Sequence, residues 1–215
     1  MHDVYQKTLS KKVIFKGIGL HSGRTSTINI TPTQEDEGIV FKRIDLNENN
    51  LIKANFNNVS SARLCTTLEN NFGVKVSTVE HLLAAFYIIG IDNALVEIDN
   101  EEVPIMDGSS KDFLNILKEI ELIEQSKKRK FLKITNKIEL IDGKRKISIE
   151  PNEFSLEVNF QLNYKNKVIG KQKNTINFQK DDLSDVSNSR TFCLFEDIEK
   201  IKKIGLAKGG SLDNA

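Results

Sequence analysis

A short pattern that occurs twice limits the folds open to this chain more than any other feature. Each copy has a glycine, two isoleucines at alternating positions and a proline, and a strand-like stretch follows it (GIVFKR and FSLEVNF). Alternating apolar residues are typical of a half-buried strand, and a glycine suits the turn before it. The self-similarity predicts an α+β fold built from a duplicated unit, although two unrelated hairpins can also share so short a pattern. The first copy comprises Gly23, Ile28, Ile30 and Pro32, and the second comprises Gly143, Ile147, Ile149 and Pro151.

Strands and helices are both expected in the first half of the chain. Residues 78–89 carry apolar side chains at helical spacing and Gly90 follows them, which predicts a helix that ends at this glycine. Residues 104–122 are typical of a loop that enters a second helix. The polar and basic stretch 124–130 (EQSKKRK) is typical of a solvated linker. Strands are expected within 11–23 and 24–32, which flank the first turn, and within 37–45 and 93–99.

These elements divide the chain into two expected α/β-layer domains that are similar to each other. The first domain covers residues 1–125, a linker covers 126–130, and the second domain covers 131–215. The second repeat has only 85 residues and finishes on the loop-like GGSLDNA, where a packed element is expected. We therefore expect the second domain to be incomplete and the chain to be the N-terminal part of a longer protein.

The composition excludes several classes of function. A net charge of +1 gives no reason to expect nucleic acid as the main partner. The longest apolar run, LLAAFYIIGI, has about half the length that a membrane span needs, and the N-terminus lacks the apolar core of a signal peptide. Cys65 and Cys193 lie far apart and form no CxxC pair. We expect reduced thiols and a cytoplasmic protein.

An acidic residue and an imidazole stand together at the head of the predicted helix, in STVEHLLAAF. Ser77 and Glu80 fit a capping box, so Glu80 can simply start the helix. His81 lies off the apolar face and can simply be a surface residue. The two side chains lie about 100° apart around a helix, so both can also face one cleft. A metal ion with a carboxylate that deprotonates its bound water is a recurring hydrolytic pair. The apolar face comprises Val79, Leu82, Leu83, Phe86 and Ile89.

Other motifs are weak when each is taken alone. The chain has no HExxH and no GxxxxGK[ST] motif. The glycines and His21 of GIGLHSG suit a tight turn. PIMDGSS is either a turn with Asp107 and Gly108 at its apex or a site loop. The apolar residues of RTFCLFEDIEKI are either core or the lining of a groove for an acyl chain.

Seven segments together resemble the zinc-dependent UDP-3-O-acyl-N-acetylglucosamine deacetylases, which act at the committed step of lipid A synthesis in Gram-negative bacteria. The segments are GIGLHSG, LCTTL, STVEHLLAAF, GIDNALVEID, PIMDGSS, SRTF and GLAKGGSLDNA, and they occur in the family's order up to Ala215. The resemblance implies two similar α+β domains, each with an inserted element. It also implies a zinc cofactor, UDP-3-O-acyl-N-acetylglucosamine as substrate, and no nucleic-acid partner. We expect a monomer.

The resemblance implies a role for each matching residue. His81 matches the first zinc ligand, Glu80 the general base, Thr191 a residue whose hydroxyl faces the oxyanion, and Phe192 a residue beside the sugar. Zinc would lower the pKa of a bound water and polarise the acetamide carbonyl, and Glu80 would take the proton of the water. Further substrate-binding positions are Leu20, Leu64 and Cys65, on segments near the metal, and Leu194, Phe195, Ile198, Ala207, Gly210 and Leu212, in or beside the insert that forms the acyl passage.

The chain departs from the family in one respect. The family's other zinc ligands, a histidine and an aspartate four residues apart, are expected beyond Ala215, as are its lysine near the substrate phosphate and its catalytic histidine. The chain has three histidines, and His2 and His21 do not match those positions. Because catalytic zinc takes about three protein ligands, we expect this chain to be inactive by itself. Two other readings stay open: a truncated homologue that binds the nucleotide-sugar lipid or a protein without turnover, and a structural α+β protein. The codons after Ala215 would separate them.

Overall fold

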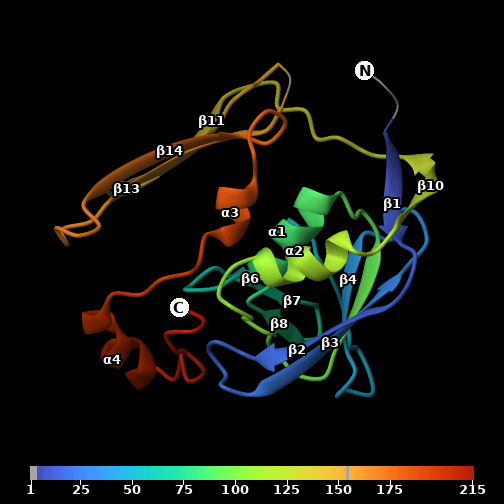
Figure 1. Cartoon of the computed structure of the whole chain (residues 1–215), viewed down its shortest axis with the longest axis horizontal. Helices are drawn as coiled ribbons and strands as arrows, with labels where there is room; N and C mark the ends of the chain where they lie inside the picture. Colours follow the sequence, from blue (N-terminus) through green and yellow to red (C-terminus); the bar gives the residue numbers. More distant parts are fainter. Residues whose placement is uncertain (1–3, 154) are drawn as a thin grey trace. The chain divides into compact units, whose positions relative to one another are not determined.

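A five-stranded mixed sheet organises the first part of the chain (Figure 1). The computed structural model describes residues 4–153 and 155–215. In order across the sheet, the strands are β2 (Val13–Ile18), β3 (Thr25–Pro32), β9 (Ala94–Ile98), β4 (Ile39–Arg43) and β5 (Leu51–Lys53). The central strand β9 pairs antiparallel with β3 and parallel with β4. A parallel pair needs a long crossover, and the segment between β4 and β9 provides it.

The first repeated hairpin forms as the sequence predicts. Strands β2 and β3 pair antiparallel, with Phe15 opposite Ile28 and Val13 opposite Ile30. Gly23 takes a φ of 68° in the turn, a left-handed value that glycine adopts without steric cost. Ile28 and Ile30 are 0% exposed, because alternate residues of β3 face the core.

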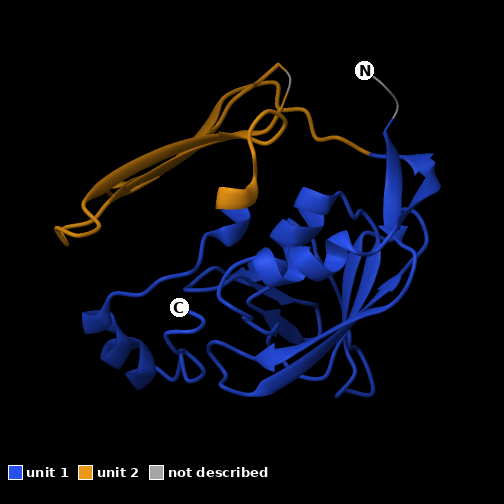
Figure 2. Ribbon diagram, viewed as in Figure 1, with its two compact units in different colours: residues 1–129, 186–215 blue, residues 130–185 orange. Residues whose placement is uncertain are grey.

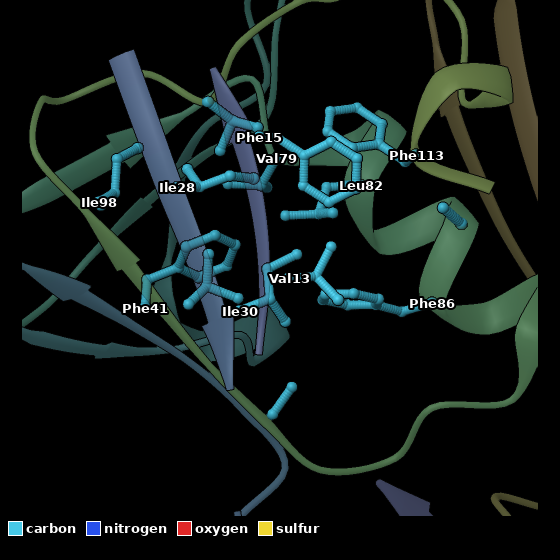
Figure 3. Close-up of a cluster of buried hydrophobic side chains, with 14 of the residues drawn as sticks. Val13, Phe15, Ile28, Ile30, Phe41, Val79, Leu82, Phe86, Ile98 and Phe113 are labelled. Atoms are coloured by element: carbon cyan, nitrogen blue, oxygen red, sulfur yellow. The ribbon is translucent and has the colours of Figure 1, made fainter. Parts of the chain in front are cut away.

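Two helices cover one face of this sheet. α1 (Glu80–Ile89) directs Leu82 and Phe86 at the sheet residues, α2 (Lys111–Lys118) directs Phe113, and Val79 joins them from the position just before α1 (Figure 3). The rings of Phe15 and Phe113 meet edge to face with their centroids 5.0 Å apart. Truncating such a buried phenylalanine to alanine typically costs about 3–5 kcal/mol of stability. α1 ends where predicted, since Gly90 takes a φ of 87° and its N–H bonds to the Phe86 carbonyl.

Two smaller sheets complete this region, and one of them corrects an expectation. The stretch 124–130, expected as a solvated linker, lies mostly in strand β10 and pairs with β1. Asn93 links the two strands, because its buried amide donates to the side-chain oxygens of Gln6, from β1, and Gln125, from β10, across 2.8 and 2.7 Å. The elements are β1 (Tyr5–Leu9) with β10 (Leu122–Lys128), then β6 (Val59–Ser61), β7 (Thr67–Glu69) and β8 (Lys75–Ser77), with the short helix η1 (Phe56–Asn58).

The chain divides into two compact units (Figure 2). Unit 1 contains residues 1–129 and 186–215, and unit 2 contains residues 130–185. The sequence analysis grouped 131–215 as one domain, whereas residues 186–215 belong to the unit of the five-stranded sheet. The expected domain boundaries stay a prediction. The remaining helices are α3 (Ser184–Asn188) and α4 (Phe195–Lys203).

Unit 2 is built on two antiparallel hairpins. The first is the second copy of the repeat, and Gly143 takes a φ of 59° at its turn, as a two-residue hairpin loop requires. Here the repeated isoleucines are not buried, since Ile147 is 69% and Ile149 46% exposed. The pattern therefore lies in an antiparallel hairpin in both units, but the turns differ, with residues 19–24 in unit 1 and residues 143–144 in unit 2, and only unit 1 packs the isoleucines into a core. The strands are β11 (Ile138–Asp142), β12 (Arg145–Ile149), β13 (Glu157–Asn163) and β14 (Lys171–Asn177).

The described part of the chain is therefore α+β, with several sheets and four α-helices. None of its helices is long and apolar enough to cross a membrane.

Candidate active site

Glu80 is the first residue of α1 and is tied to a neighbouring loop. One of its carboxylate oxygens accepts a hydrogen bond from the backbone N–H of Thr66 across 3.0 Å. The predicted capping box with Ser77 is wrong. Val79 holds the N-cap position without any side-chain cap, and the Ser77 hydroxyl donates instead to the Glu101 carbonyl across 3.2 Å. The contact that Glu80 makes therefore links the helix to the β6–β7 loop rather than to its own first turn.

Thr78 explains why the helix begins two residues later than predicted. Its φ is 56°, a left-handed value that interrupts a right-handed helix. Its buried hydroxyl donates to the Glu102 carboxylate across 2.8 Å. That bond fixes the turn through which the chain enters α1.

His81 is half-buried beside two carboxylates. Burial lowers the pKa of its imidazole, while the negative charges of Glu80 and Asp107 act in the opposite direction and do not outweigh the burial. The ring is therefore neutral at pH 7, which is the form that binds metals. The prediction that His81 can be a plain surface residue does not fit this environment.

The PIMDGSS segment forms a turn, one of the two alternatives that the sequence left open, and the alternative of a site loop stays a prediction. Asp107 makes a turn, because its carboxylate accepts from the backbone N–H and the hydroxyl of Ser109 across 2.9 and 2.7 Å. Gly108, with a φ of 88°, continues the turn. The negative charge of Asp107, in the same loop, acts on His81. The loop also contacts the SRTF segment, since the Thr191 N–H donates to the Gly108 carbonyl across 2.8 Å.

Arg190 connects this loop to the end of the chain. Its guanidinium donates to the Asp107 carbonyl across 2.6 Å and to the Leu212 carbonyl across 3.0 Å. One side chain thus holds two backbone segments that lie far apart in the sequence. Thr191 is positioned next to the Asp107 loop as a result.

The GIGLHSG turn docks against the C-terminal segment. The carboxylate of Glu102, 1% exposed, accepts from the backbone N–H groups of His21 and Ser22 across 2.9 and 2.7 Å. On the other side, Nδ1 of His21 accepts from the Ala207 N–H across 3.3 Å, and the Leu20 carbonyl accepts from the Gly209 N–H across 3.0 Å. All seven segments singled out from the sequence are therefore linked within unit 1, and GIDNALVEID is linked by the Gly90 N–H bond to the Phe86 carbonyl.

The other predicted positions divide into docked and exposed residues. Leu20 is buried, and Gly210 lies against it. Cys65 is half-buried, while Leu64 beside it is exposed with a φ of 66°. Several residues expected at the sugar and along the acyl passage lie open to solvent: Phe192, Phe195 and Leu212 are 51%, 90% and 92% exposed. Leu194 and Ile198 are half-buried at the start of α4.

The described residues do not complete a zinc site. Across residues 4–153 and 155–215, no group of three or more histidine, cysteine, aspartate or glutamate side chains is placed to hold one metal ion. His2 lies outside the described residues. His81 supplies one neutral imidazole, which suits zinc in kind, but catalytic zinc takes about three protein ligands. The described residues therefore supply one ligand of such a site, His81, and not the full set.

Sequence reasoning missed Glu102 and Arg190. The text EEVPI offers two adjacent glutamates, and nothing local shows which of them is buried. A parallel bridge between Ser77 and Glu102 sets the register that turns the second glutamate inward. Arg190 acts through backbone carbonyls, which leave no signal in the side-chain sequence.

Comparisons with known proteins follow the same segments. Residues 6–215 match the family described as UDP-3-O-acyl N-acetylglycosamine deacetylase. The UDP-3-O-acyl-N-acetylglucosamine deacetylase of Geotalea uraniireducens is 41% identical over 212 residues, which are 98% of this chain and 68% of the relative. The enzyme of the same name from Geobacter sp. (strain M21) is 38% identical, over 99% of this chain and 69% of the relative. The one from Haemophilus ducreyi is 36% identical, over 99% and 70%.

Proposed function

This chain belongs to the UDP-3-O-acyl N-acetylglycosamine deacetylase family, and from that premise we propose that the protein hydrolyses the N-acetyl group of UDP-3-O-acyl-N-acetylglucosamine in lipid A synthesis. The observation that carries the proposal is 41% identity to a deacetylase over 98% of the chain. The meeting of Glu80, His81, Asp107 and Thr191 around one helix start supports it.

Glu80 is the residue to which we assign the proton transfer. The Thr66 N–H holds one oxygen of its carboxylate, and we assign the other oxygen to the attacking water. A general base must reach the proton that it removes within hydrogen-bonding distance, and a carboxylate anchored at one oxygen has little freedom to turn away. Transfer of the proton to Glu80 leaves the oxygen of the water free to attack the acetamide carbon.

Thr191 is the residue to which we assign the developing oxyanion. Its backbone is fixed by the bond to the Gly108 carbonyl, and Arg190 holds the same loop. A donor that is already in place when negative charge develops stabilises the transition state without further reorganisation. Phe192 and the apolar positions of α4 and its surroundings, Leu194, Phe195, Ile198, Ala207, Gly210 and Leu212, are assigned to the sugar and the acyl chain.

We assign one zinc ligand to this chain, His81. Zinc, when bound, supplies a lowered pKa for water and a polarised carbonyl. The chain spans 68–70% of the length of these relatives, so about a third of each relative lies outside the matched region. We place the remaining ligands there, together with the rest of a second, duplicated domain. By itself the 215-residue chain would bind zinc weakly and lack turnover. The cytoplasmic location and the monomeric state stay predictions.

A non-catalytic binding protein is the second candidate, and the missing three-ligand cluster within the described residues favours it. An open reading frame after the codon for Ala215 that encodes H-x-x-x-D and a further histidine supports the deacetylase. A stop codon there supports the binding protein. The direct test of the deacetylase is acetate release from UDP-3-O-acyl-N-acetylglucosamine by the protein extended through that reading frame. No acetate release from a folded, zinc-loaded protein would overturn it.

A further inference from the structure

Glu102 is a buried carboxylate to which the proposed chemistry assigns no role. It is 1% exposed and lies in the segment between β9 and α2. Its Oε1 atom accepts two hydrogen bonds, from the His21 backbone N–H across 2.9 Å and from the Thr78 hydroxyl across 2.8 Å. Its Oε2 atom accepts a third, from the Ser22 N–H across 2.7 Å. A single carboxylate oxygen therefore joins the GIGLHSG turn to the segment that enters α1.

Thr78 depends on this contact because its backbone is strained. A φ of 56° is an outlier for a β-branched residue, and such a conformation persists only where the surrounding structure imposes it. Backbone bonds already hold Ser77, whose N–H donates to the Glu101 carbonyl across 2.9 Å and whose carbonyl accepts from the Val103 N–H across 3.1 Å. The Thr78 hydroxyl adds a contact at the strained residue itself. Glu102 thus holds the direction in which the chain leaves β8.

The position of Glu80, two residues later, follows from that direction. The Val79 N–H donates to the Thr66 carbonyl across 3.4 Å, and the Thr66 N–H donates to the Glu80 carboxylate across 3.0 Å. Both bonds require the start of α1 to arrive beside the β6–β7 loop. A general base must lie within hydrogen-bonding reach of its proton, and a displacement of about 1 Å can cost about 10²-fold in rate.

We propose that Glu102 is a positioning residue for the deacetylation: through the Thr78 hydroxyl it fixes the start of α1 and so places the Glu80 carboxylate for proton transfer. Glu102 acts through this contact, and the proton of the attacking water goes to Glu80. The kinetic consequence rests on the proposed function, whereas the placement of Glu80 can be measured without turnover.

Three variants change the contact to different degrees. Thr78→Val keeps the β-branched shape and removes the hydroxyl, whereas Thr78→Ser keeps the hydroxyl. Glu102→Gln keeps the size of the side chain but replaces one carboxylate oxygen by an NH₂ group. Because each carboxylate oxygen accepts from a backbone N–H, either orientation of the amide sets its NH₂ group against one of them. Thr78→Val and Glu102→Gln should therefore displace the start of α1, and Thr78→Ser should not.

The first experiment measures hydrogen exchange of the Thr66 amide by NMR in the folded 215-residue chain. Glu80→Ala removes the acceptor and gives the rate of the unbonded amide. Thr78→Val and Glu102→Gln should raise the rate by about fivefold, the factor that one typical hydrogen bond contributes, while Thr78→Ser and the amides of β3 and β9 keep their rates. If Glu102→Gln unfolds the chain, shown by loss of its thermal transition, Thr78→Val decides. An unchanged Thr66 rate in Thr78→Val, or an equal rise in β3 and β9, overturns the proposal.

The second experiment measures kcat and KM of the extended protein. Thr78→Val should lower kcat by about tenfold or more and leave KM unchanged, and Thr78→Ser should retain kcat. In a Glu80→Gln background, Thr78→Val should have no further effect, because no base remains to be placed. Ile52→Val, a buried change in β5, controls for stability alone and should retain kcat. An equal loss in both backgrounds overturns the positioning role. An extended protein that releases no acetate contradicts the proposed function instead, and the Thr66 exchange then decides the placement.

Discussion

At the scale of single residues, Glu80 has a structural contact and a proposed chemical role, and a substitution can separate them. The structural contact is the bond from the Thr66 N–H to the carboxylate. Glutamine retains a side-chain oxygen that can accept this bond, but it cannot accept a proton. A glutamine variant therefore removes the chemistry and keeps the contact.

We predict that Glu80→Gln in the extended protein lowers kcat by about 10²- to 10⁴-fold, the usual loss for a general base. The melting temperature should change little, because the bond to Thr66 stays. Steady-state kinetics and a thermal melt check both expectations. Glu101→Gln is the matched control, since Glu101 is an exposed neighbour outside the proposed site. A kcat near that of the unaltered enzyme would leave Glu80 as a purely structural residue.

The His81→Ala and Glu80→Gln variants should differ in the amount of zinc that they bind. The alanine variant removes a neutral imidazole, so bound zinc should fall together with kcat. The glutamine variant should keep its zinc. Metal analysis of both purified proteins is the check, and full zinc occupancy in His81→Ala would mean that His81 is not a ligand.

At the scale of elements, the packing of residues 186–215 against the rest of unit 1 depends on close backbone approach. A Cβ on Gly209 would lie 2.3 Å from the Gly19 carbonyl oxygen, whereas a Cβ on Gly210 would meet nothing closer than 3.4 Å. Adjacent glycines therefore provide a severe substitution and a mild one. Only the first forces two backbone segments apart.

We predict that Gly209→Ala destabilises this docking by about 1–3 kcal/mol, the usual cost of overpacking. Hydrogen exchange should speed up at residues 186–215 and stay unchanged in β3 and β9. Gly210→Ala should exchange like the unaltered chain. Equal exchange in the two variants would show that the turn at Gly19 and the C-terminal segment are not held as described.

Local patterns predicted the hairpins, the end of α1 at Gly90 and the Asp107 turn, because each depends on neighbours in sequence. These patterns failed where contacts with residues distant in the sequence determine the local structure. The sequence EQSKKRK favours a linker, but most of it pairs with β1 as strand β10, and Asn93 bonds to Gln125 of that strand. α1 begins two residues later than predicted, and there the Thr78 hydroxyl donates to the Glu102 carboxylate. Glu80 and His81 could be selected from the sequence, whereas the contact with Thr66 could not.

At the scale of the whole molecule, the two units should differ in stability. Ile28 and Ile30 are fully buried in unit 1, while the equivalent Ile147 and Ile149 of unit 2 are exposed. Isolated two-stranded hairpins are marginal in water. We predict strong hydrogen-exchange protection in the five-stranded sheet and weak protection in 130–185. Equal protection of both units would contradict this.

The central claim is that this chain carries the Glu80 and His81 part of a deacetylase whose zinc site needs further ligands. The most direct test measures zinc stoichiometry and acetate release side by side for the 215-residue chain and for the protein extended through its reading frame. We predict about one tightly bound zinc and turnover for the extended protein, and neither for the shorter chain, because losing two of about three ligands removes most of the chelate. Tight stoichiometric zinc in the 215-residue chain, or no turnover by the zinc-loaded extended protein, would contradict the claim.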